Sequence, residues 1–326
     1  KDQILSLPLS QSTGYKRAVI NAGEIANKGI EASLSFVPVK TKNFTWDASV
    51  NFAKNDNEVV KLHDEVKDFE LASARWANAS IYASEGQPYG VIVGKKLKRT
   101  EKGDVIFENG LPTFDDKVSV LGNGNYDFTL GFRNAFNYKN LSMSVLFDMK
   151  FGADIYSMSA MQSHVNGTSK ETLEGRQEWY SSEQKRQSAG VPAGNWIATG
   201  GYVGKGVMAI KNDDGEMIYV PNNVCVDPAK YWQALQTTSP EPFIYDNSFV
   251  KLREISLSYN CPKKWFVHTP IESITLSAYG RNLLLIYSNV DNIDPESSYN
   301  NGNGQGFEYG SLPSRRTFGF GINVKF

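Results

Sequence analysis

The chain of 326 residues carries 34 basic and 35 acidic side chains, which gives a net charge of −1. This balance provides no basic surface for a phosphate backbone, so nucleic acid is not expected as a partner. Hydrophobic residues make up 40% of the chain, yet no apolar run approaches the roughly 18 residues that a transmembrane helix needs. The three histidines are scattered and no CxxC or HExxH motif occurs, so the sequence predicts neither a metal site nor a cofactor.

Seven segments alternate apolar and polar residues with a period of two, which places successive side chains on opposite faces of a β-strand. In chain order they cover 30–36, 44–52, 128–133, 141–150, 254–259, 274–281 and 317–326. They approach the roughly 9–11 residues that cross a bilayer at a tilt. The pattern predicts an all-β protein, an antiparallel transmembrane β-barrel whose apolar faces contact lipid.

The last segment shows this alternation most clearly. Its apolar side chains share one parity and are expected to face lipid: Phe318, Phe320, Ile322, Val324 and Phe326. The other parity holds small or polar residues such as Gly319 and Lys325. We expect this segment to be the terminal strand on which barrel assembly depends.

The connections between the segments alternate in length. Short links cover 37–43, the tight turn at Lys139, and 261–273, whereas long excursions cover about 55–126, 151–248 and 283–314. Bacterial outer-membrane barrels have short periplasmic turns and long extracellular loops. We therefore expect a multi-pass outer-membrane protein with extracellular excursions and a periplasmic C-terminus.

The alternative to a barrel is a soluble β-sandwich. The strands of a sandwich usually have about 5–6 residues, however, and its connections only a few.

Polar side chains on the second parity of these strands are expected to face the barrel lumen. The candidates are Glu31, Asp47, Asn51, Arg133, Asp148, Glu254 and Arg281. Three roles are open for them: contact with a plug, the lining of a transient passage, or simple contact with water in a polar lumen.

Lys251 and Arg253 share the parity of lipid-facing Ile255, which predicts snorkelling toward lipid headgroups near the outer rim. A local bulge that turns both residues inward is the alternative.

The long excursions carry aromatic side chains that are candidates for ligand contact, because aromatic faces pack on sugar rings and on peptide side chains. They are Trp76, Tyr82, Trp179, Tyr180, Trp196, Tyr202, Tyr231 and Trp232. The alternatives are local packing of the loops and an interface with a lid protein. Asp227 as N-cap and Pro228 as the first helical residue predict a short helix, in which Tyr231 and Trp232 pack locally.

Two further loop segments resemble cation sites. KNDDGEM at 211–217 lacks the spaced ligands of a calcium loop and lies between apolar flanks, which predicts an Asp-Gly hairpin. The acidic segment with Asp291, Asp294 and Glu296 could hold a hard cation through oxygen ligands. A structural turn is the interpretation that we favour for it.

Five segments occur in a characteristic order: NAGEIANKGIEASLSFVPV, NFTWDASVNFAKNDNEVVKL, YDNSFVKLREISLSYNCPKKW, GRNLLLIYSNVDNIDPE and SLPSRRTFGFGINVKF. Together they resemble the C-terminal barrel half of SusC/RagA-type TonB-dependent transporters of Bacteroidetes, and the resemblance covers essentially the whole chain. It implies a plugged barrel of about 22 strands, of which residues 1–326 supply about seven or eight. The N-terminal half of the same transporter is expected to supply the plug, the other strands and the TonB contact.

The resemblance also implies a function. Such transporters lie in outer-membrane lipid, carry a SusD-like surface lipoprotein as a lid, and import oligosaccharides or peptides with energy that TonB delivers. The many Trp and Tyr residues of the excursions favour oligosaccharides. A passive porin, or a surface receptor in which the chain is only scaffold, is the alternative. Catalysis is not expected, because the sequence holds no GxSxG elbow and no recognisable Ser/His/Asp order.

Overall fold

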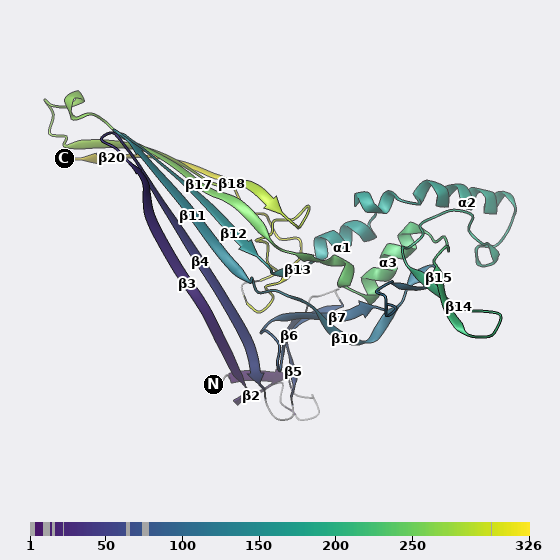
Figure 1. Ribbon diagram of the computed structural model, residues 1–326. Coiled ribbons are helices and arrows are strands. Elements are labelled where there is room, and N and C mark those ends of the chain that lie inside the picture. The colour runs from purple at the N-terminus through teal and green to yellow at the C-terminus, as the bar shows by residue number, and fades with distance from the viewer. Residues whose placement is uncertain are drawn as a thin grey trace.

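The computed structural model describes residues 4–8, 14, 17–21, 23–62, 66–73, 78–300 and 302–326. Its main feature is a sheet of seven antiparallel strands that runs diagonally across Figure 1, in the order β20-β18-β17-β12-β11-β4-β3. The strands cover Glu24–Lys40 (β3), Phe44–Lys61 (β4), Phe128–Tyr138 (β11), Leu141–Phe151 (β12), Phe249–Asn260 (β17), Ser273–Ser288 (β18) and Thr317–Lys325 (β20). The expected antiparallel barrel wall is confirmed. Within this sheet, each strand pairs with the sheet strand that precedes it along the chain.

Cross-strand register explains why the period-two pattern produces a sheet with two different faces. One row of directly paired residues is apolar throughout and runs Trp46, Phe136, Met143, Leu257, Ala278, Phe320. Another row is polar or small and runs Ser33, Asn51, Gly131, Asp148, Lys251. Directly paired residues share a face of the sheet. We refer to these faces as the apolar face and the polar face.

The apolar face exposes large side chains. Phe132 and Phe147 have ring centroids 6.4 Å apart, and on the terminal strand Phe318, Phe320 and Ile322 are 68%, 87% and 72% exposed. A continuous apolar surface of this kind is unsuited to water and fits a lipid-facing barrel wall.

The short and long connections lie at opposite ends of the sheet. The links β3–β4, β11–β12 and β17–β18 lie at the end near the C-terminus in Figure 1, and Lys139 adopts a φ of 51° in the second of them. The 3-10 helix η5 (Lys263–Trp265) lies in the third. The long excursions leave from the other end. β4 continues to Lys61 and β18 to Ser288, past the expected loop starts at 55 and 283.

The excursions contain secondary structure of their own. The first holds β5 (Asp68–Ser73), β6 (Ala79–Ser84), β7 (Val91–Leu97), β8 (Ile106–Glu108), β9 (Leu111–Pro112) and β10 (Phe114–Asn123). The second holds β13 (Asp154–Ser157), α1 (Met158–Val165), η2 (Lys170–Leu173), α2 (Arg176–Ser188), η3 (Ala193–Asn195), β14 (Val207–Lys211), β15 (Met217–Pro221), α3 (Pro228–Thr238), η4 (Glu241–Phe243) and β16 (Ile244–Asp246). The third holds β19 (Phe307–Glu308). At the N-terminus, β1 (Ile4–Pro8) and β2 (Arg17–Asn21) pair with each other.

Small shared sheets join the excursions into one unit. β14 of the second excursion pairs with β8 of the first, and β13 pairs in parallel with β19 of the third. A buried cluster including Ile81, Ile92, Tyr156, Trp232 and Phe307 draws on the same three segments. The ordered excursions therefore form a packed base on which side chains can be held in fixed positions.

Two local expectations are confirmed. The segment KNDDGEM connects β14 and β15 as a hairpin. α3 begins at Pro228, and the Asp227 carboxylate accepts a hydrogen bond from the Ala229 N–H at 2.9 Å. Within the part of the chain that the structure describes, no helix has the length and apolar character needed to cross a membrane.

Candidate functional site

The polar face brings together the residues predicted to face the lumen: Glu31, Asp47, Asn51, Arg133, Asp148, Glu254 and Arg281. Glu31, Asn51 and Asp148 line one shallow hollow, and Asp47 and Arg133 line a second. Arg281 donates to Glu254 on the neighbouring strand at 2.7 Å. Contact of these side chains with a plug or a passing ligand stays a prediction.

Side chains of the polar face also form hydrogen bonds to one another from strand to strand. The Ser33 hydroxyl donates to Asn51 Oδ1 at 2.7 Å, and Arg133 Nε donates to the Ser144 hydroxyl at 3.1 Å. Such cross-strand bonds stabilise the wall and hold its polar groups in place.

A cluster of charged side chains lies where the polar face meets the third excursion. Lys251 Nζ donates to Asp294 Oδ1 at 2.6 Å and to Glu296 Oε2 at 2.7 Å. Arg253 donates to Glu296 Oε1 at 2.6 Å and also pairs with Asp148. The side chains of Lys251 and Asp294 are only 5% and 8% exposed. We call these five residues the rim cluster, and it fastens the third excursion to the wall.

The rim cluster shows that the snorkelling expected of Lys251 and Arg253 is wrong. Leu146 and Phe147 are consecutive on β12, but their partners on β17 are Glu254 and Leu252, so Arg253 is an extra residue. One inserted residue is a β-bulge, and it reverses the faces of the residues beyond it. Lys251 therefore pairs with Asp148 on the polar face, which confirms the alternative of a bulge that turns the pair inward.

The two loop carboxylates of the rim cluster stay ionised over a wide pH range. Burial opposes their ionisation, but hydrogen bonds from Lys251 and Ser314 outweigh it and lower the pKa of Asp294 to about 2. Hydrogen bonds from Arg253 and Lys251 likewise outweigh burial and lower the pKa of Glu296 to about 2. Sequence analysis placed these carboxylates in a turn or a cation site. In the structure they are the ion-pair partners of Lys251 and Arg253.

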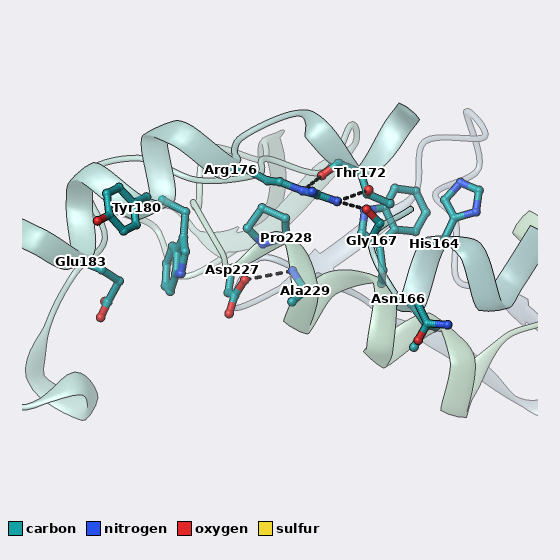
Figure 2. Close-up of a pocket in the computed structure, with 13 residues that line it drawn as sticks. His164, Asn166, Gly167, Thr172, Arg176, Tyr180, Glu183, Asp227, Pro228 and Ala229 are labelled. Carbon is teal, nitrogen blue, oxygen red and sulfur yellow. Dashed lines mark hydrogen bonds between the residues drawn. The ribbon is translucent and has the colours of Figure 1, made fainter. Parts of the chain in front are cut away.

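The second excursion contains an open pocket of about 420 Å³ between the end of α1, the first half of α2 and the start of α3. This volume falls within the roughly 300–1,000 Å³ of small-molecule sites. The lining includes His164, Asn166, Arg176, Trp179, Asp227 and Trp232, most of which are labelled in Figure 2. We call it the helical pocket.

Hydrogen bonds fix the walls of the helical pocket. Arg176 Nε donates to the Thr172 carbonyl oxygen at 2.6 Å, and a terminal nitrogen of Arg176 donates to the Gly167 carbonyl oxygen at 2.5 Å. Figure 2 shows these bonds along the upper side of the pocket. His164 Nε2 lies 2.6 Å from a carboxylate oxygen of Glu171. The guanidinium and the imidazole are thus engaged by the protein itself.

Trp232 forms the base of the helical pocket. It is 8% exposed, and its ring centroid lies 4.5 Å from that of His164 and 5.1 Å from that of Tyr231. The indole Nε1 is buried and has no hydrogen-bond partner among the described residues. A buried donor without a partner costs free energy, so the indole is held in place by its packing.

The structure gathers some of the predicted loop aromatics and separates others. Trp179, Tyr180 and Trp232 line the helical pocket. Tyr202 and Tyr231 pack beside Trp232, with their own centroids 4.4 Å apart. Trp196 donates to the Ser182 hydroxyl on α2 at 3.0 Å, and Tyr82 lies on β6 of another sheet. Trp76 lies outside the described residues. Ligand contact by any of these aromatics stays a prediction.

Sequence reasoning missed the polar lining of this pocket. His164, Asn166 and Arg176 carry no motif, and they meet Asp227 and Trp232 only because α1 and α3 pack together across a long stretch of sequence. The N-cap signal at Asp227 located one wall, but no local pattern indicated that a pocket lies beside it.

No protein-family model matches the chain. Among curated proteins, the chain is 26% identical over 360 residues to TonB-dependent receptor P3 of Formosa agariphila, and the match covers all of this chain and 31% of that protein. It is 26% identical over 159 residues to TonB-dependent receptor SusC of Bacteroides thetaiotaomicron, covering 44% of this chain and 16% of SusC. The chain thus spans 31% of the length of the curated relatives that match it throughout.

Solved structures give the same result for the fold. The RagAB peptide transporter superposes with a TM-score of 0.65 at 18% identity, covering all of this chain and 32% of that one. The RagAB peptide importer in its open-open state superposes with a TM-score of 0.61 at 16% identity. These matches confirm the resemblance found in the sequence motifs: the chain is similar over its full length to the C-terminal barrel portion of SusC/RagA-type TonB-dependent transporters.

Proposed function

We propose that this chain forms wall and outer loops of an outer-membrane transporter that imports large nutrients with energy delivered by TonB. The observation that carries the proposal is the two-faced sheet whose long connections all leave one end, in a chain similar throughout to TonB-dependent receptors. In this proposal the apolar face contacts lipid and the polar face lines the lumen. The excursions lie at the cell surface and the C-terminus at the periplasm.

The proposed partners complete the barrel and cover it. The N-terminal half of the same transporter supplies the plug, the remaining strands and the segment that binds TonB. A SusD-like lipoprotein covers the excursions. Supporting this lid, Leu173, Tyr180 and Ile197 of the second excursion are 60%, 59% and 89% exposed, and such apolar side chains are typical of surfaces that another protein covers.

Oligosaccharides come ahead of peptides as the proposed nutrient. Support comes from the aromatic side chains that the helical pocket brings together, since their faces pack well on sugar rings. RagAB is a peptide transporter, which keeps peptides as the second candidate. No catalytic role is proposed, and the relatives are named as receptors and transporters.

Uptake measurements in cells that express the full transporter test this proposal. We expect deletion of the transporter to abolish uptake of one nutrient class, and loss of TonB or of the proton-motive force to abolish the same uptake. Uptake that persists without TonB indicates a passive porin, and surface binding without uptake indicates a receptor. Native mass spectrometry of the detergent-purified complex reports whether a lid lipoprotein is present.

A further inference from the structure

We propose that the helical pocket is a surface subsite for a segment of a neutral saccharide, an inference that rests on the transport function proposed above. The pocket lies within the second excursion, on α1, α2 and α3, and away from the seven-stranded wall (Figure 1). A saccharide held there stays at the cell surface before any part of it enters the lumen.

The cation of the pocket and most of its acidic oxygens are engaged by the protein, which disfavours an anionic ligand. Arg176 donates to the carbonyl oxygens of Thr172 and Gly167. Glu183 accepts from Arg186 Nε at 2.9 Å. One oxygen of Asp227 caps α3 through the Ala229 N–H. An anionic ligand therefore finds no unpaired cation in the lining, and recognition must come from neutral groups.

Two polar groups of the lining remain available for a neutral ligand. The exposed Asn166 carboxamide and the second carboxylate oxygen of Asp227 have no hydrogen-bond partner among the described residues. Asn166 and Asp227 both lie below Arg176 in Figure 2. A sugar hydroxyl both donates and accepts, so hydroxyls on different parts of a saccharide can satisfy the carboxylate and the carboxamide.

The aromatic side chains complete a site of the kind that suits a pyranose ring. Tyr180 is 59% exposed at the mouth, whereas Trp232 is 8% exposed at the base, and Trp179 belongs to the same lining. Aromatic faces bury the C–H face of a sugar while its hydroxyls point to polar neighbours. Trp232 also belongs to the buried cluster with Met158, Met161 and Leu235, so the base is preorganised and little ordering is needed on binding.

A peptide fits this site less well. Peptides are commonly bound by main-chain hydrogen bonds along a strand edge or by capture of a terminal charge. None of the residues that line the pocket belongs to a strand, and its one cation, Arg176, is already bonded. The lining therefore offers a peptide neither a strand edge nor a free cation for its carboxylate. Only the free oxygen of Asp227 remains for an N-terminal amine, and the peptide probes below test that contact.

Binding to the full transporter, purified in detergent with its native partners, tests the subsite. The probes are short neutral oligosaccharides from α-glucan, β-glucan and β-mannan, compared with synthetic peptides of similar mass. Affinity is measured by calorimetry, and hydrogen exchange locates the protected segments. We expect a saccharide to slow exchange at 164–183 and 227–232. Protection of these segments by peptides alone, or no protection by any saccharide, overturns the subsite.

Matched variants assign the binding to the pocket. We expect Trp179→Ala to weaken saccharide binding roughly tenfold, since an aromatic stacking contact is lost, and Trp179→Phe to restore most of it. Asp227→Asn keeps a good N-cap while removing one acceptor oxygen, and it should weaken binding severalfold. Trp196→Phe is the control, because this indole lies in the same excursion outside the lining. Equal affinity of the Trp179→Ala and Trp196→Phe variants overturns the subsite.

Different results would contradict the subsite and the transport function. If saccharide binding ignores the pocket variants while uptake still requires TonB, only the subsite is wrong. If uptake proceeds without TonB, the transport function is wrong whatever the pocket binds, and the subsite then loses its role in import.

Discussion

The indole Nε1 of Trp46 donates a hydrogen bond to Asn134 Oδ1 at 3.1 Å on the apolar face of the sheet. Asn134 lies on the apolar face, between Phe132 and Phe136 in the alternation, and it is only 7% exposed. A carboxamide that faces hydrocarbon is costly without a partner. Ala48 lies directly opposite Asn134, and its small side chain leaves the space that the indole uses to reach the carboxamide.

Trp46→Phe is expected to lower the free energy of unfolding by about 1–3 kcal/mol, because Asn134 then loses its donor. In the presence of Asn134→Leu the same substitution should cost clearly less, since no polar atom is left without a partner. Thermal unfolding of the detergent-purified transporter measures both losses. Equal losses in the two backgrounds would show that the hydrogen bond contributes nothing.

Lys251→Met is expected to destabilise the third excursion by about 3–5 kcal/mol, because it leaves the buried carboxylate of Asp294 with one cation fewer. Lys325→Met is the matched control. Lys325 lies 3.5 Å from Glu272, but these side chains are 70% and 59% exposed, and exposed pairs contribute about 0–1 kcal/mol. Hydrogen exchange over 289–300 and 302–316 reports the difference, and similar exchange in both variants contradicts the prediction.

Low pH is expected to release the third excursion from the wall. Asp294 and Glu296 have a pKa of about 2 in the folded protein, below the roughly 3.9 and 4.3 of unfolded Asp and Glu. A lowered pKa contributes stability that is complete above the unfolded values and is lost as pH falls through the folded ones. Exchange protection of 289–300 should therefore hold from about pH 7 to 5 and decline toward about pH 2.

A variant without the two carboxyl groups checks this origin of the pH response. Asp294→Asn combined with Glu296→Gln should weaken protection of the excursion at neutral pH and remove its decline in acid. A decline of the same size in the double variant would assign the pH response to other groups.

Gly319→Ala is expected to weaken the pairing of β20 with β18. A Cβ on Gly319 would lie 2.4 Å from the ring of Tyr279, which itself stacks on the Arg281 guanidinium with 4.9 Å to the ring centroid. The ring must swing away and lose this stacking, at a cost of about 0.5–1 kcal/mol. Gly131→Ala is the control, because its Cβ would meet nothing nearer than Asn51 Cβ at 3.9 Å.

The temperature at which the barrel unfolds in detergent measures both glycine variants. Tyr279→Ala provides the coupling test, since Gly319→Ala should cost little once the ring is gone. A Gly319→Ala variant as stable as Gly131→Ala would exclude a role for this close contact in the pairing of β20.

Sequence predicted the wall well because side chains on a strand alternate and one face must be apolar throughout. The same rule failed at Arg253, where one inserted residue reverses the faces and no residue type announces the insertion. The helical pocket was not predictable for a different reason. Its lining comes from 164–183 and 227–232, and only tertiary packing of α1 on α3 brings these segments together.

The link between Ser157 and Glu308 has a consequence for the order of folding. These residues are 151 positions apart, and the Ser157 hydroxyl donates to the Glu308 carboxylate at 2.9 Å beside the parallel pairing of Tyr156 with Phe307. Contacts so distant along the chain pay a large loop-closure entropy and form late. Phe307 shares its buried cluster with Trp232, so the cluster beneath the helical pocket is complete only once the third excursion has docked on the second.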